Sequence, residues 1–296
     1  MTDKSLIKNI LSQFPGKMVT VNNHKMHVYT EGEGTVTLIF MSGSGTCSPV
    51  YDFKTLFSKM SDEYQIAVVE KAGYGFSDIT NMSRDIDTIL FETRTALKEA
   101  NINPPYILFP HSMSATEAFY WVQCYPDEIK AIIGLDPALP IHYEIWDINY
   151  SLKRMKLYSK LINKRLKLLR SIIANNLPPL KYGILTKPDK KACKAISNRR
   201  ILTNDMINET LMVKENAKKI NAEALKTVPM LFFISNGTEV GMKEGEWEKS
   251  INNYTKELNT KIVSLNAGHY LHDILPEEIA NKSKVFIKGI QNRSLT

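Results

Sequence analysis

The chain has 296 residues, of which 43% are hydrophobic and 23% are charged, and its formal net charge is +7. These values are ordinary for a globular protein with a packed core and exclude a disordered chain. The three cysteines lack metal-like spacing, which argues against a disulfide framework or a zinc site. The sequence contains neither a signal-like apolar stretch before Gly16 nor an apolar run near the roughly 18 residues of a membrane span, so we expect a soluble, cytoplasmic protein.

The first predicted elements form a hairpin, in which strands 18–21 and 25–30 flank the turn Asn22-Asn23-His24. Short apolar runs then alternate with helix-compatible stretches. The expected strands are 36–41, 66–69, 107–109, 131–135, 230–234 and 262–265, and the expected helices are 53–59, 86–100, 115–124 and 246–258. Continuous apolar runs are typical of strands that are covered on both faces. The order therefore predicts an α/β fold: a mainly parallel sheet with helices on both faces.

The alternation stops near Pro140 and resumes near Pro229. Between them, apolar residues recur at spacings of three and four, as on one face of a helix. This stripe comprises Leu152, Met155, Tyr158, Ile162, Leu166, Leu169 and Ile173. The segment 139–225 has 18 basic and 7 acidic residues, whereas the rest has 20 and 24. Such a charge step suggests a separate unit, and we predict a helical cap at 139–225 inserted into a core of 1–138 and 226–296.

The most informative stretch is 107–115, which reads Ile-Leu-Phe-Pro-His-Ser-Met-Ser-Ala. An apolar strand leads directly into Ser112, and a helix-forming segment follows at once. A serine that merely caps this helix would give the same local pattern. The stretch resembles the nucleophile elbow of the α/β-hydrolase superfamily, G-x-S-x-G, with Pro110 and Ser114 in place of the two glycines. The resemblance implies that Ser112 is a nucleophile.

Two other loops add to this resemblance. Ser42-Gly43-Ser44-Gly45 follows the first expected parallel strand, where the family usually has His-Gly and forms half of its oxyanion hole. The resemblance implies that the backbone amides of Ser44 and Met113 are the oxyanion donors. The stretch 68–78 is similar to the family's D-x-x-G-x-G-x-S-D loop, with Glu70 in place of the aspartate. We assign this loop a role in the scaffold only.

The last motif follows the last predicted strand. Leu265-Asn266-Ala267-Gly268-His269-Tyr270, with Pro276-Glu277-Glu278 further on, is similar to the family's closing G-H motif. Because a serine hydroxyl needs a base with a pKa near neutrality, the resemblance implies that His269 activates Ser112. His272 is the nearest rival, three residues downstream.

The acid that would orient the histidine is open between two carboxylates. Asp136 directly follows the predicted strand 131–135, a position that some lipases of the superfamily use. Glu239 follows 230–234, about one residue later than the family's usual acid. We favour Asp136 and keep Glu239 as the alternative, since sites gather at the carboxyl ends of parallel strands.

These residues together imply a serine hydrolase that cleaves a carboxylic ester or a related acyl bond of a small molecule through an acyl-enzyme. No metal or organic cofactor is expected. A serine at the elbow, where the superfamily's dehalogenases and epoxide hydrolases have aspartate, argues against those activities. Other chemistry on the same triad remains an alternative, namely a thioesterase, a C–C hydrolase or a lyase, and so does a catalytically inactive binding protein.

The predicted cap helix at 151–171 carries eight lysines and arginines beside its apolar stripe. The simplest interpretation is a lid helix with solvated charges. The alternative is weak contact with an anionic membrane surface. A nucleic-acid partner is not expected, because no aromatic interleaving or known motif accompanies the charge.

Overall fold

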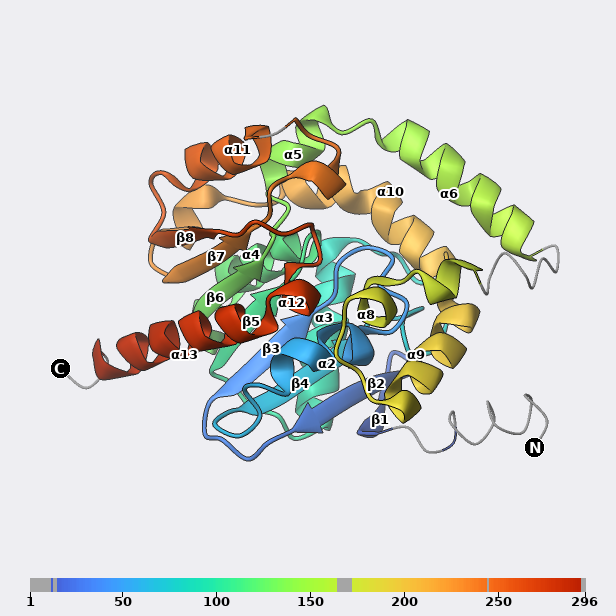
Figure 1. Ribbon diagram of the computed structural model, residues 1–296, viewed down its shortest axis with the longest axis horizontal. Coiled ribbons are helices and arrows are strands. Elements are labelled where there is room, and N and C mark those ends of the chain that lie inside the picture. The colour runs from blue at the N-terminus through green and yellow to red at the C-terminus, as the bar shows by residue number, and fades with distance from the viewer. Residues whose placement is uncertain (1–11, 13–14, 164–171, 244, 294–296) are drawn as a thin grey trace.

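A computed structural model describes residues 12, 15–163, 172–243 and 245–293. In this part of the chain an eight-stranded sheet has the order β1-β2-β4-β3-β5-β6-β7-β8 (Figure 1). The strands are β1 Lys17–Val21, β2 His24–Glu31, β3 Thr37–Met41, β4 Gln65–Glu70, β5 Tyr106–Pro110, β6 Ile129–Leu135, β7 Met230–Ile234 and β8 Thr260–Ser264. The β1–β2 and β2–β4 pairs are antiparallel, and the other pairs are parallel. The prediction of a mainly parallel sheet that begins with an antiparallel hairpin is confirmed.

The hairpin turn is one residue shorter than the sequence indicates. Asn22 and Asn23 have φ angles of 46° and 63°, and His24 is already paired with Val21. A two-residue turn of this kind needs positive φ at both positions, which asparagine tolerates better than most residues.

Each buried strand supplies side chains to two separate hydrophobic cores. In β3, for example, Leu38 and Phe40 pack on one face, and Ile39 and Met41 pack on the other. Helices α2 Pro49–Phe57, α12 Leu271–Ile274 and α13 Pro276–Arg293 cover the first face, and α3 Ile86–Glu99, α4 Ser114–Cys124 and α11 Glu246–Thr255 cover the second (Figure 1). This double covering explains why the strands read as continuous apolar runs.

A helical insertion lies between β6 and β7. Its helices are α5 Pro140–Ile145, α6 Ile148–Asn163, α8 Pro178–Lys181, α9 Lys187–Arg200 and α10 Asn204–Lys218. Figure 1 shows α5, α6 and α10 along the top of the molecule, and α10 contacts both of the others. The inserted cap is thus confirmed, while the boundaries 1–138, 139–225 and 226–296 remain a prediction. No helix in the described ranges is both long and apolar enough to cross a lipid bilayer.

The predicted stripe of the cap helix is only partly right. Leu152 and Met155 pack inward, but Tyr158 is 42% exposed, and Ser159 takes the buried position beside it. The spacing permits either residue to face inward, and the bulkier ring lies outside. Leu166 and Leu169 lie outside the described residues, as does the side chain of Ile162.

Candidate active site

Three chemically active side chains lie just beyond the carboxyl ends of parallel strands. Ser112 follows β5, Asp136 follows the neighbouring β6, and His269 follows β8. Because these ends lie at one edge of the sheet, residues far apart in the sequence come together there.

Ser112 sits in a sharp turn with a positive φ of 54°, a strained value for a residue other than glycine. Its N–H donates to the carbonyl of Leu135, and its own carbonyl accepts from the N–H groups of Ala115 and Ala138. Ser114 fills the position where the motif has glycine, and its buried hydroxyl donates to the carbonyl of Met41 at 2.7 Å. The turn therefore accommodates a small polar residue there, because that residue's hydroxyl has an acceptor.

The ring of His269 is bound to Asp136. Its Nδ1 lies 2.5 Å from Oδ2 of the fully buried carboxylate. Oδ1 of Asp136 accepts from the backbone N–H of Ser235 at 2.8 Å and from the indole N–H of Trp247 at 2.7 Å. These donors offset the cost of burying the carboxylate. They also fix the orientation of the carboxylate toward the imidazole.

Glu239 contacts the same histidine in another way. Its Oε2 accepts the backbone N–H of His269 at 2.8 Å. The ring nitrogen Nδ1 is bound to Asp136 instead. Of the two acids that the sequence leaves open, Asp136 is thus the partner of the ring, and Glu239 holds the loop that carries it.

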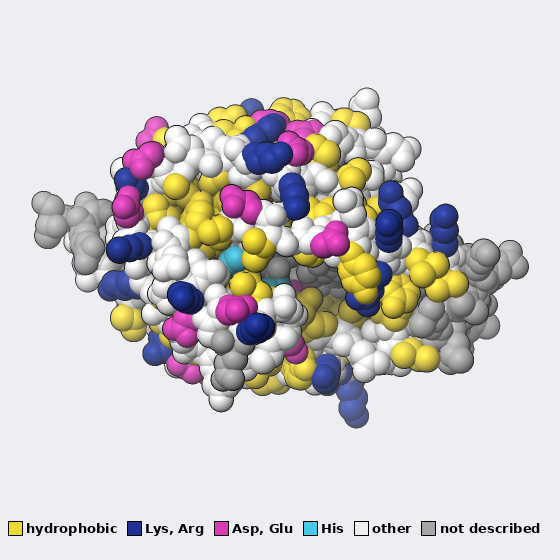
Figure 2. Space-filling view, turned by 90° about the horizontal axis from the view of Figure 1, so that it is seen from above, with side chains coloured by type: hydrophobic (Ala, Val, Ile, Leu, Met, Phe, Trp, Pro, Cys, Tyr) yellow, Lys and Arg dark blue, Asp and Glu magenta, His cyan; other side chains and the backbone are white. Residues whose placement is uncertain are grey.

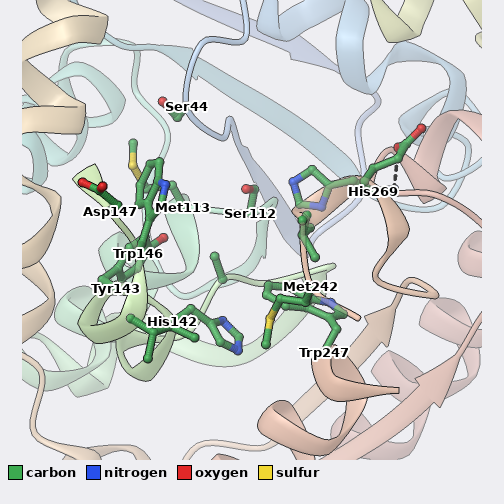
Figure 3. Close-up of a pocket in the computed structure, with 15 residues that line it drawn as sticks. Ser44, Ser112, Met113, His142, Tyr143, Trp146, Asp147, Met242, Trp247 and His269 are labelled. Atoms are coloured by element: carbon green, nitrogen blue, oxygen red, sulfur yellow. Dashed lines mark hydrogen bonds between the residues drawn. The ribbon is translucent and has the colours of Figure 1, made fainter. Parts of the chain in front are cut away.

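Ser112 and His269 open into one cavity of about 380 Å³. The space-filling view in Figure 2 shows a hollow with histidine at its floor. In the close-up of Figure 3, the imidazole of His269 extends from its loop toward Ser112. The ring nitrogen that is not bound to Asp136 is Nε2, and it is the nitrogen left to accept a proton.

Ser44 and Met113 also line this cavity. The β3–α2 loop approaches the elbow so closely that a Cβ on Gly43 would lie 2.9 Å from Cβ of Ser112. Met113 is the N-cap of α4, so its amide lies at the positive end of a helix dipole. Among the described residues, neither the Ser44 nor the Met113 amide donates to a protein acceptor. Both amides are therefore available to an anionic oxygen in the cavity.

The remaining wall is mainly apolar, apart from Asp147 and Glu239, and comes from the β6–α5 loop, the cap, the loop after β7 and the start of α11. It includes Ala138, Tyr143, Ile145, Trp146, Val240, Met242 and Trp247. His142 also lines it, with its ring stacked on Trp247 at 4.2 Å between centroids. Burial lowers the pKa of His142 to about 4, so this imidazole is neutral near pH 7. The wall suits an uncharged organic group.

A second histidine–aspartate pair lies next to the first. Nε2 of His272 is 3.3 Å from Oδ2 of Asp52, and the ring of His111 lies 4.7 Å from the rings of both His269 and His272. Possible ligand atoms of Asp52, His111 and His272 lie within 4.8 Å of one another, so this set could accept a metal ion. All three residues are buried, and none lines the cavity. His272, the rival base, therefore faces Asp52 rather than Ser112.

Sequence reasoning missed a buried ionic cluster that joins the cap to the elbow helix. Nζ of Lys71 is 2.7 Å from Oε1 of Glu117 in α4 and also contacts Glu209 in α10. The hydroxyl of Tyr74 donates to Oε2 of Glu209 at 2.8 Å. Burial, with Glu209 adding to it, raises the pKa of Glu117 to about 7 even though Lys71 opposes the shift. In the sequence, the cluster is indicated locally only by Glu117, the one charged residue of α4. That residue alone does not indicate a partner in the cap.

Comparison with known proteins places this geometry among related folds. No family model matches the chain. The uncharacterized protein YbdG of Bacillus subtilis (strain 168) is 36% identical over 288 residues, which cover 93% of this chain and 86% of YbdG.

Two crystal structures share the fold at low sequence identity. Epoxide hydrolase VrEH1 from Vigna radiata has a TM-score of 0.74 and 19% identity, with 94% of this chain and 98% of that chain covered. The haloalkane dehalogenase DbeA-M1 loop variant from Bradyrhizobium elkanii has a TM-score of 0.66 and 16% identity, with 94% and 98% covered. At such identities the likeness concerns the fold alone.

Proposed function

We propose that this chain, which belongs to the α/β-hydrolase superfamily and to the same family as YbdG, is a serine hydrolase that cleaves a carboxylic ester or a related acyl bond. The proposal rests mainly on one observation: the His269 ring is bound to Asp136 at 2.5 Å and faces Ser112 in a cavity. A serine hydroxyl becomes a useful nucleophile only when such an oriented base accepts its proton.

The proposed reaction has two halves. Oγ of Ser112 attacks the acyl carbonyl while Nε2 of His269 takes the hydroxyl proton, and Asp136 stabilises the resulting imidazolium. The proton then passes to the leaving alcohol, and an acyl-enzyme forms. Water, deprotonated by His269, attacks this ester and releases the acid and the free serine.

The amides of Ser44 and Met113 would hold the oxyanion in both halves. Both are free of protein acceptors and line the same cavity as Ser112. Removing one such donor in a serine protease costs about 3 kcal/mol of transition-state stabilisation, which indicates the scale of their contribution.

Ser112 also separates this proposal from the activities that name its structural neighbours, an epoxide hydrolase and a haloalkane dehalogenase. Those reactions begin in the superfamily with a carboxylate nucleophile, and this chain has a hydroxyl there. An alkoxide that attacks a carbonyl instead yields an acyl-enzyme, which water hydrolyses readily. The mainly apolar wall favours an uncharged acyl or alcohol group on the substrate.

A fluorophosphonate probe tests the proposal. We expect covalent labelling of the wild type and none of Ser112→Ala. Before labelling, the wild type should hydrolyse p-nitrophenyl esters and Ser112→Ala should not, and labelling should abolish the activity of the wild type. Ser44→Ala is the matched control: this serine lines the same cavity but contributes its backbone amide, so labelling should persist. A folded wild type that is neither labelled nor active on an ester panel would favour an inactive binding protein, and labelling of Ser112→Ala would place the nucleophile elsewhere.

A further inference from the structure

Helix α6 exposes a second apolar stripe. Its inner face contributes Ile148, Leu152 and Met155 to a cluster with cap residues of α5 and α10. On the opposite side, Tyr150 is 59% exposed and Leu157 is 57% exposed. These two residues are seven positions apart, so they lie two turns apart on one face. Nothing in the described part of the chain covers that face.

Basic side chains flank this outer stripe. Lys153, Arg154, Lys156 and Lys160 are all exposed, and the helix contains no aspartate or glutamate. Among the described residues none of the four forms an ion pair, in contrast to Lys218 at the end of α10 and Lys219 directly after it. The Arg154 guanidinium lies 5.6 Å and 5.8 Å from the ring centroids of Tyr150 and Tyr158. Cations and apolar groups are therefore interleaved on one exposed surface.

The mouth of the cavity adjoins this surface. Ile145, at the end of α5, is 72% exposed and also lines the cavity, and Trp146 and Asp147, which connect α5 to α6, line it too. In Figure 2, apolar, basic and acidic side chains surround the hollow, and apolar side chains and lysines or arginines continue across the same face. A flat partner on α6 would therefore lie over the entrance to the cavity.

We propose that the outer face of α6 docks on an anionic lipid bilayer. The side chains of Tyr150, Leu157 and Tyr158 enter the boundary between headgroups and acyl chains, and the four cations lie against the lipid phosphates. A second copy of this chain is a poor occupant, because two faces of the same positive charge repel one another. A nucleic acid would use the charges but would leave the aliphatic Leu157 exposed.

Co-sedimentation with sucrose-loaded vesicles tests the proposal. The full chain carries Ser112→Ala, so the result does not depend on whether the protein hydrolyses lipids. We expect binding to phosphatidylcholine vesicles with about 30 mol% phosphatidylglycerol to exceed binding to pure phosphatidylcholine by about tenfold or more, and to weaken in about 0.5 M NaCl.

Two variants separate the parts of the face. The triple change Lys153→Glu, Lys156→Glu and Lys160→Glu should lower binding about tenfold or more. Tyr150→Ser with Leu157→Ser should lower it about fivefold and leave the salt dependence unchanged. The matched control is Lys187→Glu, Lys190→Glu and Lys191→Glu on α9, which changes the same charge at exposed positions of a helix without exposed large hydrophobics. This control should retain most of the binding.

Three outcomes would overturn the proposal: no binding of the parent protein to anionic vesicles, an equal loss from the α9 control, or unchanged binding after the two serine substitutions. An equal loss would indicate attraction by overall charge alone. Unchanged binding after the serine substitutions would indicate a soluble polyanion as the partner, and a fluorescent oligonucleotide would then be expected to bind as tightly as the vesicles. Circular dichroism checks that every variant is folded.

Discussion

Two histidine–aspartate pairs lie on either side of His111, and they differ in what their rings can reach. In the pair of His269 and Asp136, the nitrogen and oxygen are 2.5 Å apart, and the histidine side chain is 14% exposed and faces the cavity. In the pair of His272 and Asp52, they are 3.3 Å apart, and the side chains are 0% and 4% exposed. The same two residue types thus form one pair that substrate can reach and one that is sealed in the core.

The surroundings of the two aspartates differ as well. Asp136 follows a strand end with a φ of 47°, and its second oxygen has two further N–H donors. Asp52 lies in the first turn of α2, and Nδ1 of its partner His272 has no hydrogen-bond partner among the described residues. A carboxylate with both oxygens hydrogen-bonded is suited to hold a base in one orientation. Because the sealed pair does not line the cavity, we expect its main contribution to be to packing and stability.

The largest expected effect is the loss of activity in Asp136→Asn. The amide would accept from Ser235 and Trp247 and present its NH₂ to Nδ1 of His269, so the ring would carry its proton on Nε2 and could not accept one from Ser112. We expect kcat to fall by about 10⁴-fold, as in the corresponding change of a serine protease. Steady-state ester hydrolysis measures it.

Glu239→Gln is the control for this prediction, because Glu239 binds the backbone of the same histidine. The amide oxygen can still accept that N–H, so kcat should change by less than about tenfold. If Glu239→Gln were the more damaging change, the assignment of the acid would be reversed.

A change in the sealed pair should affect stability instead. His272→Leu leaves the buried carboxylate of Asp52 without its partner, which costs about 3 kcal/mol of unfolding free energy and lowers Tm by about 6 °C or more. The kcat of the folded protein should stay within about tenfold of the wild type. Thermal and urea unfolding, with kinetics at a temperature where the variant is folded, measure both quantities.

Adding Asp52→Asn to His272→Leu should recover part of the lost stability, because a neutral amide is less costly to bury than an unpaired carboxylate. A fall in kcat as large as that of Asp136→Asn, in a folded His272→Leu protein, would contradict the division between an accessible and a sealed pair.

The smallest expected effect concerns pH and the cluster that joins the cap to the elbow helix. The pKa of Glu117 is raised to about 7 by burial, from an ordinary value of 4.5. The stability that its protonated form contributes is fully present below that ordinary value and is lost as the pH rises through 7. Glu117→Gln does not ionise, so its Tm relative to the wild type should rise by about 3 °C between pH 5 and pH 8.

Glu128→Gln provides a control of opposite sign. Hydrogen bonds from Arg94 lower the pKa of Glu128, so this carboxylate stabilises the fold above its ordinary pKa. The Tm of Glu128→Gln should therefore lie below that of the wild type by a nearly constant amount between pH 5.5 and pH 8. A Glu117→Gln curve parallel to that of the wild type over the same range would show that Glu117 does not titrate there.

Much of the fold could be predicted because its signals are local. The apolar runs end within a few residues of the observed strands, and the predicted strand 230–234 agrees with β7 at both ends. The positions of Ser112 and His269 beyond two strand ends also follow from neighbouring residues. The exposure of Tyr158 could not be predicted in this way, because it depends on which face of α6 meets α10.

The alternation of strands and helices, the helical insertion, and the strand ends that carry the hydroxyl and the imidazole could all be predicted from the sequence alone, because each follows from local residue patterns and their order along the chain. Three pairings became clear only from the folded structure: Asp136 rather than Glu239 meets the ring, His272 faces Asp52, and Lys71 joins Glu117 to Glu209. Those pairings join residues that are distant in the chain, and their geometry depends on the register of the strands and the packing of the cap.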